Sequence, residues 1–199
     1  HTGTIDLTDG GTTPFGVLTF TGLEPVDITG MTTATLQLPG GGSDVTVAEG
    51  TTSTTGEAAM VVSGTYGSSD TPFETAAFRG NTTVAIDTTG TSDGDDTVVI
   101  NETNDAHGNT NLEVDTGVGS DTVTVAGAVS VSGSLTLDSQ QIDFADGSVT
   151  AGSSVTLHAG GGSLVHGLES DAALSCRERA SDEGDRPCDR LDAITTCWR

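Results

Sequence analysis

A repeated segment between residues 86 and 125 decides the fold prediction. IDTTG at 86–90 and DTVVI at 96–100 return as VDTG at 114–117 and DTVTV at 121–125. The two Asp-Thr-Val segments are 25 residues apart, and the strands that precede them are 28 residues apart, so the difference lies in the intervening loop. A repeat of this length matches one coil of a parallel β-helix, in which each coil buries its apolar residues only against its neighbours.

The alternation of apolar residues with Thr, Ser and Asp extends this pattern over the first 160 residues. Each alternating pair predicts one short strand with a buried face. Consecutive strands are often six to fourteen residues apart, which leaves no room for a helix between them. We therefore predict an all-β fold, a right-handed parallel β-helix, with a sandwich of antiparallel hairpins as the alternative. The predicted pairs are Ile5/Leu7, Leu18/Phe20, Val26/Ile28, Leu36/Leu38, Val45/Val47, Val84/Ile86, Val98/Ile100, Leu112/Val114, Val123/Val125, Val129/Val131, Leu135/Leu137, Ile142/Phe144 and Val155/Leu157.

The composition supports strands and excludes one class of partner. The chain has 199 residues and a net charge of −23, with no Lys, so it lacks the basic face that nucleic-acid binding needs. The 35 Thr favour strands, and the 28 Gly favour turns. No apolar run approaches the roughly 20 residues that span a bilayer, so we predict no membrane span.

The charge distribution predicts a boundary near residue 170. Residues 1–170 carry a net charge of −21 and contain a single base, Arg79, whereas residues 171–199 carry −2 and contain all the cysteines. We predict a β-helical domain over 1–170 and a divergent, non-solenoid tail over 171–199. Cys176, Cys188 and Cys197 match no zinc pattern and are disulfide candidates whose pairing stays open.

Several blocks of the first 160 residues carry a family resemblance. LTFTGLEPV at 18–26, LQLPGG at 36–41, TPFETAAF at 71–78 and the turn GDDTV at 94–98 resemble a module of giant repetitive bacterial surface proteins. Those proteins are secreted, hemagglutinin- or adhesin-like, and predicted to be parallel β-helices. The resemblance implies an extracellular or cell-surface location and supplies no catalytic residues.

One turn of the repeat is similar to a calcium-binding motif. TGVGSDTVT at 116–124 is similar to the nine-residue repeat GGxGxDxUx, with Thr in place of the first Gly, and residues 92–98 match it more weakly. Glycines let carbonyls turn toward a hard cation, and aspartates of stacked turns complete its oxygen shell. The candidate calcium ligands are Asp93, Asp95, Asp96, Gly119 and Asp121. The alternative interpretation is a set of solvated Asp-Gly corners.

Other polar residues give weaker signals. Asn81 and Asn101 each begin an N-glycosylation sequon, which arises easily by chance in a Thr-rich chain. His107 is expected to be a turn residue. The carboxylates lie singly on Thr-rich strands without the aromatic residues that usually accompany them in sugar-cleaving sites, so we predict no enzymatic activity.

The functional expectation is a non-catalytic structural or adhesive module of a bacterial surface protein or filament. Its open coil ends would associate end to end, or with neighbouring repeats of the same chain, because unpaired strand edges invite pairing. Surface glycans are a second class of partner. A calcium-dependent folding module is the alternative function, and a polysaccharide-active β-helix enzyme is a more distant one.

Overall fold

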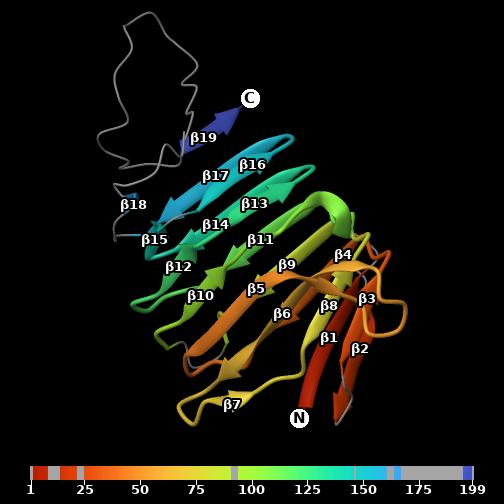
Figure 1. Ribbon diagram of the computed structural model, residues 1–199. Coiled ribbons are helices and arrows are strands. Elements are labelled where there is room, and N and C mark those ends of the chain that lie inside the picture. Colours follow the sequence, from red (N-terminus) through yellow and green to blue (C-terminus); the bar gives the residue numbers. More distant parts are fainter. Residues whose placement is uncertain are drawn as a thin grey trace, which may run out of the picture.

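The chain forms β-strands throughout the part that the structure describes. The computed structural model describes residues 25–90, 94–145 and 147–160 in full, together with the strands at 2–8, 14–21, 164–166 and 195–198 (Figure 1). The one helical element among these residues is the short 3-10 turn η1 (Asp105–His107). The all-β class is therefore confirmed.

Parallel strands stack in two large sheets, and the chain alternates between these sheets as it proceeds (Figure 1). The parallel strands of the first sheet are β4 (Thr33–Gln37), β9 (Thr83–Asp87), β11 (Asn111–Asp115), β14 (Ser134–Ser139) and β17 (Ser154–Ala159). Those of the second sheet are β5 (Ser43–Thr51), β10 (Thr97–Ile100), β12 (Thr122–Val125), β15 (Gln141–Phe144) and β18 (Leu164–His166). A third, smaller sheet pairs β13 (Ala128–Val131) with β16 (Ser148–Ala151) in parallel.

The register of these stacks matches the sequence repeat. Val98 pairs with Val123 across β10 and β12, and Ile86 pairs with Val114 across β9 and β11. The repeated segments therefore lie directly on one another, as the spacing predicts. Parallel stacking is confirmed for these strands, and the antiparallel sandwich is wrong for them.

Antiparallel strands occupy the N-terminal end of both large sheets. In the first sheet, β1 (Thr2–Thr8) pairs antiparallel with β4 and with β2 (Pro14–Thr21). In the second sheet, β6 (Ala58–Tyr66) pairs antiparallel with β5, with β7 (Thr71–Pro72) and with β8 (Ala76–Arg79), whereas β3 (Val26–Thr29) pairs in parallel with β8 at the edge. Neither sheet closes on itself in the described part of the chain, since the outermost strands are β2 and β19 in one and β3 and β18 in the other.

A ladder of aliphatic side chains fills the interior between the sheets. Val45, Val98, Val123 and Ile142 occupy equivalent register positions in the second sheet, and none is more than 2% exposed. Burying one such side chain contributes roughly 1.5–3 kcal/mol, and every coil repeats the contribution. Each added parallel strand therefore extends the same column of buried aliphatic side chains.

The predicted domain boundary near residue 170 lies outside the described residues. Of the predicted tail, only β19 (Thr195–Trp198) is described, and it pairs antiparallel with β17. The GGG segment at 40–42 is the corner between β4 and β5. Gly41 and Gly42 have φ values of 111° and 83° there, which favour glycine.

Candidate functional site

The structure brings together most of the residues that the calcium-like pattern predicts. The Asp121 carboxylate accepts a hydrogen bond from the Asp96 backbone N–H through Oδ1 (2.8 Å). Asp95 Oδ1 likewise accepts from the Ser120 N–H (3.0 Å). These bonds link turns that are 25 residues apart, because Thr97 pairs with Thr122 one residue further on. Asp93 lies outside the described residues.

We call Asp96, Asp121 and the Thr88 hydroxyl, which bonds to Asp96, the aspartate corner. Asp96 is 2% exposed and Asp121 is 1% exposed. Asp96 Oδ2 accepts from the Thr88 hydroxyl at 2.8 Å, whereas its Oδ1 is buried with no hydrogen-bond partner among the described residues. Two carboxylates are therefore buried in adjacent coils. Buried charges of this kind need a cation, a proton or further hydrogen bonds to offset the lost hydration.

Burial changes the acidity of this corner. It raises the pKa of Asp96 to about 6, and the negative charge of Asp121 acts in the same direction. The hydrogen bond from the Thr88 hydroxyl acts in the opposite direction. No base offsets the two charges within residues 25–160, because Arg79 is the only Lys or Arg there and its carboxylate partner is Glu57.

Gly119 shapes the aspartate corner by leaving out a side chain. A Cβ at this position would lie 2.6 Å from Asp121 Oδ1 and 2.7 Å from the Gly94 carbonyl oxygen. Both distances are shorter than real Cβ contacts. Only glycine therefore lets the 117–120 turn approach the turn of the preceding coil so closely.

The corner supplies a small set of oxygen ligands. No group of three or more His, Cys, Asp or Glu side chains with metal-binding geometry occurs in the described part of the chain. A hard cation at Asp96 and Asp121 would therefore need hydroxyl and carbonyl oxygens for the rest of its shell, as Ca²⁺ accepts.

The two sequon asparagines differ in accessibility. Asn81 is 1% exposed, and its Nδ2 donates to the Ile28 carbonyl (3.1 Å) and to Asn109 Oδ1 (3.0 Å). Its Oδ1 accepts from the Met31 N–H at 2.9 Å. A glycan on Asn81 would break these bonds, so the folded chain does not offer this side chain for modification. Asn101 is half-buried.

The cysteines fall mostly outside the described residues. Cys197 lies in β19, opposite Val155 of β17. Cys176 and Cys188 belong to the part of the tail that the structure does not describe. Their pairing therefore stays a prediction.

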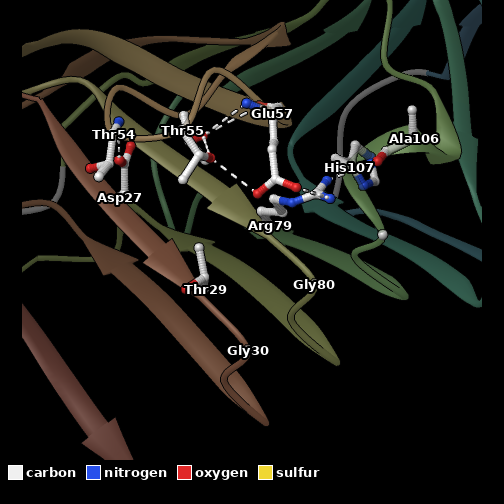
Figure 2. Close-up of a pocket in the computed structure, with 12 residues that line it drawn as sticks. Asp27, Thr29, Gly30, Thr54, Thr55, Glu57, Arg79, Gly80, Ala106 and His107 are labelled. Atoms are coloured by element: carbon white, nitrogen blue, oxygen red, sulfur yellow. Dashed lines mark hydrogen bonds and ion pairs between the residues drawn. The ribbon is translucent and has the colours of Figure 1, made fainter.

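A second site, a pocket, lies where β3, the β5–β6 turn (52–57), the end of β8 and η1 meet (Figure 2). Its volume is about 560 Å³. We call it the Arg79 pocket. It lies at the N-terminal end of the stack, where the antiparallel strands replace regular coils.

Asp27 of β3 fixes the wall formed by the β5–β6 turn. Its Oδ1 accepts from the Ser53 N–H (2.8 Å), and its Oδ2 accepts from the Ser53 hydroxyl (2.9 Å) and the Thr54 N–H (2.8 Å). Burial works to raise the pKa of Asp27, but the hydrogen bonds from Thr54 and Ser53 outweigh it and lower the pKa to about 2. Asp27 therefore stays ionised at neutral pH and holds the turn in place.

Arg79, at the end of β8, joins three segments around the pocket. Its Nη1 donates to the carbonyls of Ala58 (2.9 Å) and Ala106 (3.2 Å). Its Nη2 donates to Glu57 Oε1 at 3.1 Å (Figure 2). These bonds hold the guanidinium group in one orientation.

His107 lies in η1 at the pocket and is fully buried. Its Nδ1 accepts from the Asn109 N–H at 3.0 Å, so the proton of the neutral imidazole is on Nε2. Burial lowers the pKa of His107, while the charges of Glu49 and Asp105 oppose this shift. His107 is thus a buried turn residue, as expected for the segment, and it is neutral at pH 7.

Sequence reasoning did not find the Arg79 pocket. Its lining comes from four segments spread over residues 27–108, and no short motif connects them. One signal was available, because Arg79 is the only Lys or Arg in residues 1–170. A lone base in so acidic a chain is expected to contact several acceptors.

Comparisons with known proteins identify no relative. No family model, no curated protein and no solved structure matches the chain. Within the described residues, no helix has the length and hydropathy needed to cross a bilayer.

Proposed function

We propose that this chain is an extracellular structural or adhesive module of a bacterial surface protein or filament, wound as a right-handed parallel β-helix. The observation that carries the proposal is the register-matched parallel stacking of repeated segments in both large sheets. Such a stack can be extended by further coils without a change in its packing. Its role is to display a regular surface, with no chemical step.

A regular polar surface is the second support for this role. Gln37, Asp87, Asp115, Asp138 and His158 occupy equivalent register positions at the outer face of the first sheet. Gln37 Nε2 donates to Asp87 Oδ2 (3.0 Å), and His158 Nδ1 lies 2.7 Å from Asp138 Oδ1. Neighbouring strands are roughly 4.8 Å apart, so the three central positions of this column place carboxylates at that spacing, and Gln37 and His158 extend it at either end.

The ends of the stack supply the means of assembly. The outer strands β2 and β3 each pair with a single neighbour in the described chain, and an unpaired strand edge can accept a strand of another molecule. We expect the purified chain to associate end to end as its concentration rises. Salt should promote this association, because it screens the repulsion between acidic surfaces.

Sedimentation velocity over a range of protein and salt concentrations tests the assembly proposal. The expected result is a concentration-dependent rise in mass, with elongated particles in electron micrographs. A strict monomer at the highest concentration in high salt would contradict the filament form of the proposal.

A calcium-dependent folding module is the second candidate function, and the aspartate corner favours it. Calcium there would offset the charges of Asp96 and Asp121, and the buried Asp96 Oδ1 would serve as one of its oxygen ligands. Circular dichroism spectra and melting curves in calcium and in chelator test this candidate. Identical curves in both conditions would remove calcium as a structural requirement.

A further inference from the structure

We propose that the Arg79 pocket binds a neutral saccharide unit. The inference extends the adhesive role proposed above, and it rests on that role only for the source of the ligand, a glycan of a neighbouring surface.

The first observation is that the pocket pairs unused donors with unused acceptors. A guanidinium group has five N–H donors, and Arg79 spends three of them on Ala58, Ala106 and Glu57. Thr29 is exposed and lines the same pocket (Figure 2), and its hydroxyl makes no hydrogen bond to another residue that the structure describes. Glu57 accepts from Arg79 and Thr55, which leaves part of its acceptor capacity open.

This combination fits hydroxyl groups. A saccharide hydroxyl donates one hydrogen bond and accepts others, so vicinal hydroxyls can donate to Glu57 while accepting from Arg79. The Thr29 hydroxyl can take either role. A purely apolar ligand would take water from the remaining donors and acceptors of these groups without replacing its hydrogen bonds, at a cost in affinity.

The second observation is that the walls are fixed before a ligand arrives. Asp27 holds the β5–β6 turn by three hydrogen bonds, and Arg79 is held by three acceptors. Rigid walls reduce the conformational entropy that a ligand must remove on binding.

Two glycines keep part of the pocket open. Gly30 and Gly80 have φ values of 70° and 65°, and a Cβ at either position would meet no atom within 4 Å. Positive φ values disfavour residues with a side chain at these two positions. The space that a side chain would fill therefore stays open to a ligand. The volume of about 560 Å³ is within the usual range for small-molecule sites.

The third observation is the charge of the pocket. Asp27 and Glu57 outnumber Arg79, and His107 is neutral, so the lining carries a net negative charge within a chain of −23. This field repels acidic ligands. A carboxylate would also have to compete with Glu57 for the Arg79 guanidinium group. A neutral saccharide therefore fits better than a uronic acid or a sialic acid.

Saturation-transfer NMR and titration calorimetry on the full chain test the proposal. The probes are glucose, galactose, mannose and N-acetylglucosamine, with glucuronate as the acidic comparison. We expect saturation transfer to at least one neutral sugar and weaker binding of glucuronate. Thr29→Val keeps the side-chain shape but removes the hydroxyl, so it should weaken the binding about fivefold, the effect of one lost hydrogen bond.

Thr136→Val is the matched control, because Thr136 is a half-buried strand threonine of β14 outside the pocket lining. It should leave the binding unchanged. The absence of saturation transfer to every neutral sugar, equal losses in the two variants, or tighter binding of glucuronate would each overturn the proposal.

The result is separable from the adhesive role itself. Attachment of the chain to cells without saturation transfer to any neutral sugar would overturn the pocket proposal and leave the adhesive role standing. Sugar binding by a chain that neither attaches to cells nor associates would support the pocket proposal and contradict the adhesive role.

Discussion

Single residues in this chain connect segments that are far apart in the sequence, and Asp27 is the clearest case. Its carboxylate accepts three hydrogen bonds from Ser53 and Thr54, which lie in the turn between β5 and β6. The bonds stabilise the ionised form, so protonation of Asp27 must weaken the attachment of the turn. The pH dependence of stability reports on this contact.

We expect Asp27→Asn to be less stable than the parent chain at pH 7, and the difference to shrink in acid. The folded pKa of Asp27 is about 2, below its ordinary value of 3.8. Stability from a lowered acidic pKa is fully present above the ordinary value and is lost as the pH falls through the folded one. The difference in urea midpoint should therefore decline between pH 4 and pH 2.

Asp143→Asn is the control for the change in net charge, since Asp143 is an outward residue of β15. It should show no comparable decline. A constant difference between Asp27→Asn and the parent chain from pH 7 to pH 2 would contradict the assigned role.

The aspartate corner gives a second prediction at the residue scale. In chelator, Asp96→Asn should melt at the same temperature as the parent chain or higher, because it removes a buried charge. In calcium, the parent chain should gain melting temperature and the variant should not. A calcium-induced gain of equal size in both chains would exclude Asp96 as a ligand.

At the scale of elements, buried asparagines join the coil corners that precede β4, β9 and β11. Asn109 Oδ1 accepts from the Asn81 N–H at 2.9 Å, and Asn109 Nδ2 donates to the Phe78 carbonyl at 2.8 Å. Asn81 in turn contacts the backbone at Ile28 and Met31. The asparagine side chains therefore provide hydrogen-bond partners for backbone N–H and C=O groups at corners where no neighbouring strand does so.

Asn81→Ala should destabilise the chain by roughly 2–3 kcal/mol, because it leaves several buried polar groups without partners. Asn101→Ala is the matched control. Asn101 begins the other sequon and is only half-buried, so its replacement should change the stability by less than about 0.5 kcal/mol. Urea unfolding measures both values. Equal effects of the two substitutions would contradict the importance of the Asn81 contacts.

The strands that could be predicted from the sequence are those with one buried face. Val98 and Ile100 of β10 are buried while Thr97 is exposed, and this difference produces the alternation. In β8, by contrast, Ala76, Ala77 and Phe78 are all buried, because both faces of the strand are covered. Without alternation, neither β8 nor the adjacent β6 gave a period-2 signal.

The two candidate sites also differ in whether a local sequence pattern predicts them. The sequence repeat itself brings Asp96 and Asp121 together, so the aspartate corner could be predicted from spacing. The Arg79 pocket depends on how the β5–β6 hairpin folds back beside β3 and η1, and no local pattern specifies that arrangement.

At the scale of the whole molecule, the acidic charge and the stacked architecture are compatible because each coil exposes an outer face. Large hydrophobic residues line one inward ladder, while Asp and Thr stand outside. A narrow core of this kind needs few aromatic residues. The low content of large apolar residues is therefore no obstacle to folding.

The repeated segments stack in parallel and in register, and pairs of nitroxide labels on neighbouring strands measure this register in solution. In a chain with all three cysteines replaced by Ser, labels are placed at Thr97 and Thr122 in one sample and at Val99 and Thr124 in another. Both pairs face each other in the register of β10 and β12. Adjacent strands lie roughly 4.8 Å apart, so we predict strong and similar dipolar broadening in the two samples. Broadening in only one pair, or in neither, would contradict the parallel register and the account built on it.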